Sequence, residues 1–109
     1  MSDIAQRLRE ASKAAQQIEF RAVTLPAGAP KSHECHLNVD QFVKAYPGHR
    51  AVRGWLVAGM LQKHSVVAAP DGSLFDITPL PYRVSFFSHP GPEDEFWAVA
   101  DYLSPEFSL

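Results

Sequence analysis

The chain has 109 residues, of which 46% are hydrophobic and 20% charged, and its formal net charge is −2 at pH 7. This length supports one compact core but not two ordinary domains, so we expect a single domain over residues 1–109. The near balance of acidic and basic side chains creates no strong field for nucleic acid or for an anionic membrane, and we expect neither as a partner.

The N-terminal segment MSDIAQRLREASKAAQQ is polar and charged, unlike the apolar part of a signal peptide. No apolar run reaches the roughly 18 residues that a membrane-spanning helix needs. The chain contains one cysteine and therefore forms no internal disulfide. These features predict a cytoplasmic protein in a reducing compartment, where a lone thiol stays reactive.

Apolar residues recur at helical spacing in the N-terminal segment, which predicts an amphipathic helix over residues 3–18. A short strand is expected over residues 20–25. Proline and glycine then interrupt regular structure over residues 26–30, so we expect a loop there. This loop leads toward the cysteine.

A second helix is predicted over residues 36–46, and the Pro-Gly pair that follows is a usual stop signal. Its apolar stripe consists of Val39, Phe42, Val43 and Tyr46. Counting back four residues from Val39 places Cys35 on the same side, in the first turn. Backbone N–H groups of a first turn and the helix macrodipole favour a thiolate, and they lower a cysteine pKa from its usual value of about 8.5.

Four extended segments are expected next, and their ranges are 51–58, 64–69, 73–78 and 82–88. A short helix is predicted within residues 92–103, followed by a loose end at 104–109. In the first extended segment, Gly54 indicates that another group approaches the backbone closely, and the cysteine helix is one candidate for that group.

The sequence Pro70-Asp71-Gly72 predicts a three-residue hairpin loop, which places Ala69 opposite Ser73. In that register His64, which opens its strand, and Asp76 lie on the same face as diagonal neighbours, about 7–8 Å apart by backbone. A two-residue loop would turn Asp76 to the other face. The proline favours the first register, in which the two side chains meet.

Cys35, His64 and Asp76 thus supply what an activated thiol needs: a nucleophile, a proton acceptor and a carboxylate that orients the imidazole. Their order resembles that of the papain-like cysteine peptidases, especially the transglutaminase-like branch, over about residues 33–78. In that branch a cysteine precedes a histidine with hydrophobic strand residues and then Asp-Pro-Thr. Here the corresponding residues are Cys35, His64-Ser-Val-Val and Asp76-Ile-Thr78.

The resemblance implies an α+β fold with a papain-like or transglutaminase-like core, in which the N-terminal helix and the cysteine-bearing helix pack on a small antiparallel sheet. It also implies an enzyme without a cofactor, a peptidase, deamidase or transglutaminase-like protein acting on a protein or peptide. Cys35 would be the nucleophile, His64 the general base and acid, and Asp76 the orienting group. Candidates for oxyanion or substrate binding are His33, Asn38 and Trp55, besides the backbone N–H of Cys35.

Two alternatives stay open at this point. A lone cysteine is often a buried apolar residue, and the chain would then be a non-enzymatic protein-interaction or regulatory domain. The other is a zinc-binding domain with the ligands His33, Cys35, His64 and Asp76, although no paired CxxC or HExxH spacing is present. The sequence does not specify the oligomeric state, and it is compatible with a homodimer.

Overall fold

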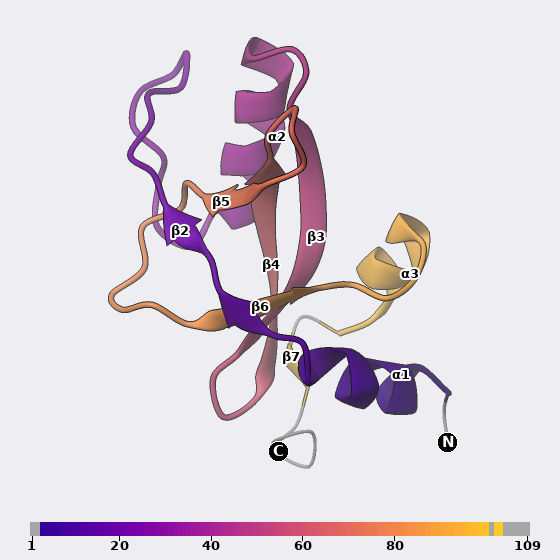
Figure 1. Ribbon diagram of the computed structural model, residues 1–109. Coiled ribbons are helices and arrows are strands. Elements are labelled where there is room, and N and C mark those ends of the chain that lie inside the picture. The colour runs from indigo at the N-terminus through magenta and orange to yellow at the C-terminus, as the bar shows by residue number, and fades with distance from the viewer. Residues whose placement is uncertain (1–2, 101, 104–109) are drawn as a thin grey trace. The chain divides into compact units, whose positions relative to one another are not determined.

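The computed structural model describes residues 3–100 and 102–103 (Figure 1). The elements in chain order are α1 (Asp3–Ser12), β1 (Gln16–Gln17), β2 (Glu19–Phe20), α2 (Cys35–Ala45), β3 (Arg50–Val57), β4 (Leu61–Ala68), β5 (Leu74–Asp76), β6 (Ser85–Ser88), α3 (Glu93–Ala98) and β7 (Tyr102–Leu103). They form a small α+β fold whose strands pair mostly in antiparallel fashion. The loose end predicted for residues 104–109 lies outside the described residues.

Internal contacts divide the chain into two compact units, each assembled from separate stretches of sequence. The first unit consists of Met1–Gln17, Arg53–His64 and Val84–Leu109, and the second of Ile18–Val52 and Ser65–Arg83. Strands β3 and β4 are each shared between the units. The first unit contains α1 and α3, whereas the second contains the cysteine-bearing helix α2.

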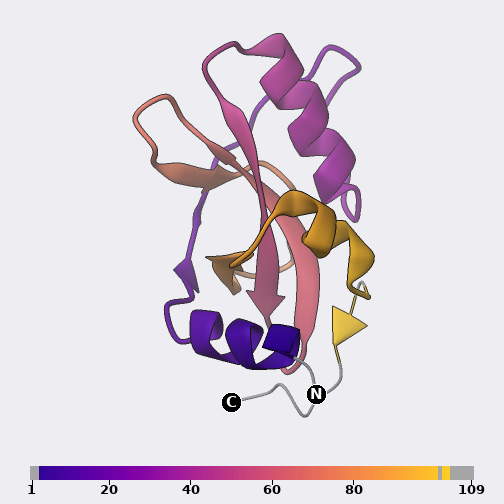
Figure 2. The ribbon, with the colours of Figure 1, turned by 90° about the vertical axis from the view of Figure 1, so that its right-hand side faces the viewer.

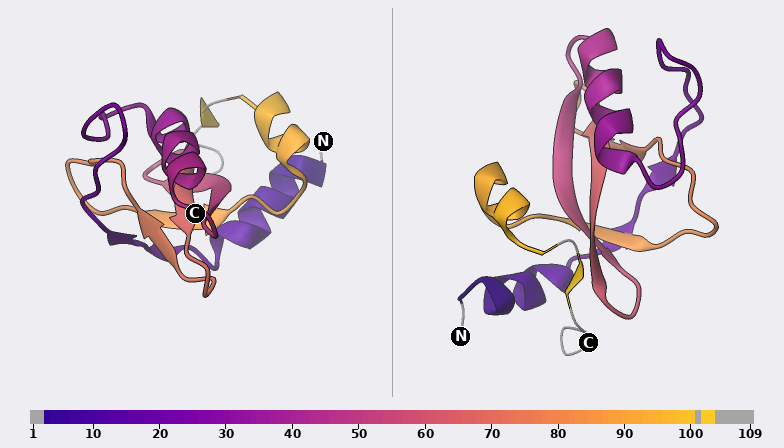
Figure 3. Two further views of the ribbon diagram at one scale, coloured as in Figure 1. Left: turned by 90° about the horizontal axis from the view of Figure 1, so that it is seen from above. Right: turned by 180° about the vertical axis from the view of Figure 1, so that it is seen from behind.

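In the first unit, β6 pairs with β1 on one side and with β3 on the other, and β7 pairs with β4, all antiparallel. The end of the β3–β4 hairpin (Figure 3) belongs to this unit. In its turn the Ala58 N–H donates to the Met60 carbonyl at 3.1 Å. The apolar core consists of Leu8, Trp55, Leu61, Phe87 and Phe96. Leu8 therefore presents the apolar side of α1 to the sheet, as the periodicity predicts.

Helix α1 ends at Ser12, six residues before the predicted end at residue 18. The N–H groups of the next three residues, Lys13, Ala14 and Ala15, still bond carbonyls three positions back, at 3.2, 3.0 and 3.1 Å. Such tighter turns commonly finish a helix. Gln16 and Gln17 are then extended because their backbone pairs with β6, a long-range partner that helical periodicity does not reveal.

In the second unit, β5 pairs antiparallel with β4 and parallel with β2. The parallel pair departs from the predicted all-antiparallel sheet, and β2 covers two residues instead of the predicted range 20–25. Helix α2 closely matches its prediction and packs on this part of the sheet. The core consists of Leu25, Val39, Phe42, Val67, Phe75 and Ile77.

Strands β4 and β5 form a hairpin (Figure 2). It has the predicted register, with Val67 opposite Phe75 and Ala68 opposite Leu74. The loop closes through the Ala69 N–H, which donates to the Ser73 carbonyl at 2.8 Å. Gly72 has a φ of 91°, the left-handed position that this loop type requires. Strand β4 begins at Leu61, so His64 lies inside the strand and does not open it.

The C-terminal segment contains the short helix predicted within residues 92–103, and a strand that was not predicted follows it. Helix α3 ends at Ala98, and the next residue, Val99, is already extended. Tyr102 and Leu103 form β7, whose backbone pairs with Gln62 and Leu61 of β4. The backbone pairing of Tyr102 and Leu103 with β4 therefore outweighs the helical periodicity of this segment.

Candidate functional site

Cys35 is the first residue of α2, as the sequence predicts, and it is half-buried. The preceding residue, Glu34, is the N-cap and makes no side-chain hydrogen bond to the first turn. An N-cap side chain normally bonds one of the free N–H groups of that turn. The first turn of α2 also contains no acidic side chain, and Cys35 lies at the end of the helix where the macrodipole favours an anion.

The sulfur of Cys35 lies 3.8 Å from Nδ1 of His36, within hydrogen-bond reach of a thiol. The same Nδ1 lies 2.6 Å from Oγ of Ser65, a fully buried residue of β4. His36 is not among the residues predicted for the site, and adjacent helical positions diverge by about 100°. At the start of the helix, the sulfur of Cys35 nevertheless lies close to Nδ1 of the His36 ring.

Asp76 ends β5 and is 2% exposed. Its Oδ1 accepts the backbone N–H of Thr78 at 3.0 Å, and its backbone carbonyl accepts the N–H of Arg21 at 2.9 Å. The turn that follows β5 therefore orients this buried carboxylate. Asp76 and Cys35 both belong to the second unit.

His64 is a buried residue of β4 and the last residue of the first unit's share of that strand. Its ring meets the ring of Phe86 edge to face, with 6.2 Å between the centroids. The following residue, Ser65, begins the second unit's share of β4. The triad of Cys35, His64 and Asp76 stays a prediction that rests on the hairpin register.

Asn38, a predicted oxyanion donor, is buried in α2 with only 3% of its surface exposed. Its Nδ2 donates to the Lys31 carbonyl at 2.8 Å and to Oγ1 of Thr78 at 3.0 Å. An amide nitrogen carries two protons, and both are used within the protein. In this arrangement Asn38 has no proton left to donate to an oxyanion.

The two remaining binding candidates lie in different surroundings. His33 is exposed in the loop before Cys35 and has a φ of 67°, which places it in the left-handed region. Trp55 is fully buried in the first unit, and its Nε1–H donates to Nδ1 of His89 at 3.1 Å. His33 therefore stays a candidate for substrate contact, whereas Trp55 has the role of a core aromatic residue.

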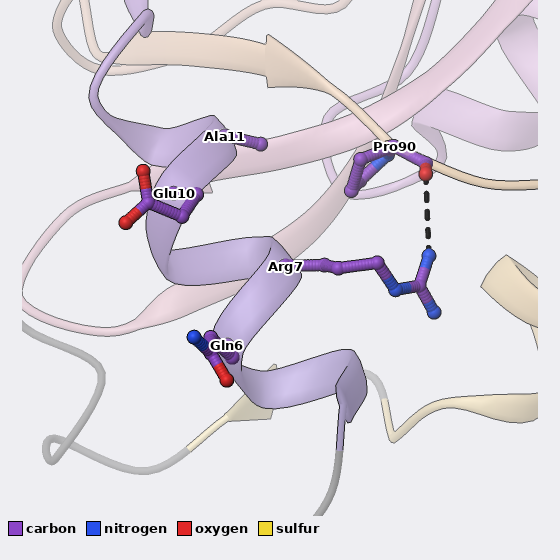
Figure 4. A pocket seen from close by; sticks show the side chains of 5 residues that line it. All are labelled: Gln6, Arg7, Glu10, Ala11 and Pro90. Atoms are coloured by element: carbon purple, nitrogen blue, oxygen red, sulfur yellow. Dashed lines mark hydrogen bonds between the residues drawn. The ribbon is translucent and has the colours of Figure 1, made fainter.

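Sequence reasoning missed a chain of polar side chains in the first unit that starts at the buried Trp55 and leads to the partly exposed Glu95 and Arg7. Because the indole N–H is only a donor, Nδ1 of His89 accepts, which leaves Nε2 to donate to Oε1 of Glu95 at 3.0 Å. The other carboxylate oxygen of Glu95 accepts from Arg7, which also donates to the Pro90 carbonyl at 3.2 Å (Figure 4). The Arg7 hydrogen bond, aided by that of His89, lowers the pKa of Glu95.

The structure offers no support for the zinc alternative. Within residues 3–100 and 102–103, no three His, Cys, Asp or Glu side chains gather in a way that could hold a metal ion. A surface hollow beside α1 is lined by Gln6, Arg7, Glu10, Ala11 and Pro90 (Figure 4). None of the predicted site residues lines this hollow.

Comparison of the chain with protein-family models, with curated proteins and with solved structures finds no match. The family resemblance therefore stays an expectation from the residues Cys35, His64 and Asp76. In the described part of the chain, the helices are too short or too polar to cross a bilayer.

Proposed function

We propose that this chain is a thiol-dependent acyltransferase or amide hydrolase of the papain-like, transglutaminase-like type, with Cys35 as the nucleophile. The observation that carries the proposal is that the sulfur of Cys35, the first residue of a helix, lies 3.8 Å from Nδ1 of its neighbour His36, which gives the thiol a polar contact at the helix N-terminus. A half-buried thiol in this position is placed to ionise and react. An inert structural cysteine would instead have apolar surroundings, so the contact also counts against the non-enzymatic alternative.

In the proposed reaction the thiolate attacks the carbonyl carbon of an amide or ester, and a C–S bond forms as the carbonyl oxygen becomes negative. The bond to the amine or alcohol then breaks, and the leaving group takes a proton from the imidazolium. Water or an acceptor amine attacks the thioester, gives a proton to the imidazole and releases the thiol. The backbone N–H of Cys35 is the proposed oxyanion donor.

Two imidazoles are candidates for the general base. We assign this role to His64, with Asp76 as its orienting group, because the confirmed hairpin register underlies that pairing. The other candidate is His36, whose Nδ1 is shared between the sulfur of Cys35 and the Ser65 hydroxyl at 2.6 Å. Because this nitrogen is shared with the Ser65 hydroxyl, it is not dedicated to Cys35, and we give His36 the secondary place.

Alkylation of Cys35 by iodoacetamide between about pH 5 and pH 9 tests the proposal directly. At neutral pH we expect the parent protein to react about tenfold faster than an unactivated cysteine, and His64→Ala to lose most of that advantage. His36→Ala should have the smaller effect. His49→Ala is the matched control, because this histidine of the second unit packs on the rings of Phe42 and Phe75.

p-Nitrophenyl acetate then separates acyl transfer from simple thiol reactivity. We expect release of p-nitrophenol together with transient acetylation of Cys35, visible as a mass increase of the intact protein and absent from Cys35→Ser. A slow alkylation rate that His64→Ala leaves unchanged would contradict the proposal. A loss confined to His36→Ala would contradict the assignment of His64 as the base.

A further inference from the structure

A buried amide joins the segment before Cys35 to the interior of the second unit. Asn38 lies one turn after Cys35 in α2. Its Oδ1 accepts the backbone N–H of Lys31 at 3.1 Å, and its Nδ2 donates to the carbonyl of the same residue at 2.8 Å. Because a backbone N–H only donates and a carbonyl only accepts, these two bonds also identify the oxygen and nitrogen of the amide.

The second proton of the Asn38 amide is donated to Oγ1 of Thr78, which is 1% exposed, at 3.0 Å. The backbone N–H of Thr78 in turn donates to Oδ1 of Asp76 at 3.0 Å. A continuous series of hydrogen bonds thus leads from Lys31, four residues before Cys35, to the carboxylate of Asp76. One end of the series is the backbone of Lys31, in the segment that leads to the proposed nucleophile. The other end is Asp76, the proposed orienting carboxylate.

We propose that Asn38 is a positioning residue of this site, which acts on Asp76 through Thr78 and on the approach to Cys35 through Lys31. The inference rests on the proposed function of Cys35. It gives Asn38 a role other than oxyanion binding, since the amide has no proton left for substrate. A carboxylate that orients a base must be held within about 0.5 Å of its working position, and locked neighbouring groups provide that precision.

The loop between Lys31 and Cys35 supports this reading. His33 has a φ of 67°, a conformation that a side chain with a Cβ disfavours and that persists only when its surroundings hold it. The paired hydrogen bonds of Asn38 to Lys31 hold the chain two residues before that position. Loss of the amide is therefore expected to release the loop as well as the carboxylate.

Thr78→Val tests the inference, because it removes the hydroxyl acceptor and keeps the shape of the side chain. We expect the rate of Cys35 acetylation by p-nitrophenyl acetate to fall about tenfold, the loss that removal of a supporting hydrogen bond often causes, with little change in KM. The pH profile of alkylation should move toward that of Asp76→Asn. Thr78→Ser keeps the hydroxyl and should restore most of the rate.

Ser12→Ala in the first unit is the control for a general loss of stability. Ser12 is 6% exposed, and its hydroxyl donates to the Arg9 carbonyl at 2.7 Å, so this change also removes one buried hydroxyl hydrogen bond. We expect Ser12→Ala to acetylate at the parent rate. Urea unfolding of each variant shows whether the two losses of stability are comparable.

The results separate this inference from the proposed function. If Thr78→Val acetylates and titrates like the parent and like Ser12→Ala, Asn38 and Thr78 only stabilise the fold, and the inference is overturned while Cys35 stays the nucleophile. If the parent never acetylates Cys35, the proposed function fails and the inference fails with it. Asn38→Ala, where it folds, should reproduce the Thr78→Val defect with an additional loss from the loop, and parent-like acetylation by this variant would also overturn the inference.

Discussion

The carboxylate of Glu95 accepts hydrogen bonds from two basic side chains, Arg7 of α1 and His89, which follows β6. Both favour the ionised form, and the Arg7 bond contributes most, so the pKa of Glu95 lies below its ordinary value of 4.5. A carboxyl whose pKa falls on folding stabilises the native state above its unfolded pKa. That stabilisation is lost as the pH falls through the lower, folded pKa.

We therefore expect Glu95→Gln to lower the free energy of unfolding at neutral pH and to flatten its dependence on pH below about 4.5. Urea unfolding at a series of pH values measures both effects. Glu10→Gln is the control, because Glu10 is exposed and pairs with Lys13, the residue just after α1, an interaction that contributes little. If the difference in unfolding free energy between the parent and Glu95→Gln stays constant as the pH falls below about 4.5, the ionised carboxylate does not stabilise the fold.

At the scale of the elements, β3 and β6 approach so closely that one position has no room for a side chain. A Cβ on Gly54 would lie 2.2 Å from the Phe87 carbonyl oxygen and 2.4 Å from the ring of Phe86. A glycine within a strand predicts such an approach, but the group is β6 and not the cysteine helix. The identity of the partner depends on strand order, which a single glycine does not encode.

Gly54→Ala should accordingly destabilise the protein by about 3 kcal/mol or more, since backbone atoms of β6 cannot move aside without disturbing the strand pair. Gly72→Ala is the contrasting variant, with open space around its Cβ and a φ of 91°. Its cost is conformational and should be about 1–2 kcal/mol. Chemical denaturation compares the two, and equal losses would mean that β6 yields more readily than its backbone contact suggests.

The elements that the sequence predicts best are those with local punctuation. Helix α2 combines an apolar stripe with Pro-Gly after it, and the β4–β5 hairpin has Pro70-Asp71-Gly72 as a loop of specific geometry. The end of α1 and the parallel pair of β2 with β5 were not predicted. Both depend on backbone partners distant in the sequence, so no local pattern marks them.

At the scale of the whole molecule, the chain carries a natural probe for each unit. Both tryptophans, Trp55 and Trp97, belong to the first unit, and Cys35, the one cysteine in the chain, belongs to the second. Neither unit contains all of β3 or all of β4, because each strand continues from one unit into the other. We therefore expect the two units to unfold together.

Tryptophan fluorescence and the labelling rate of Cys35, followed across a urea series, test this expectation. Coincident midpoints are expected, because loss of one unit removes the continuation of strands that the other needs. Cys35→Ser, monitored by fluorescence, shows whether the thiol itself alters the midpoint. Exposure of Cys35 at clearly lower urea than the fluorescence change would identify the second unit as an independent unit of unfolding.

Signals carried by neighbouring residues were sufficient to place Cys35 at the first position of a helix and to set the register of the hairpin that ends in Asp76, because helix stops and turns depend on a few adjacent side chains. Tertiary structure alone pairs Asn38 with Thr78, 40 residues away, and His36 with Ser65, 29 residues away. Such hydrogen bonds form only after packing brings buried polar groups together, and no periodicity in the sequence records the partner that each group finds.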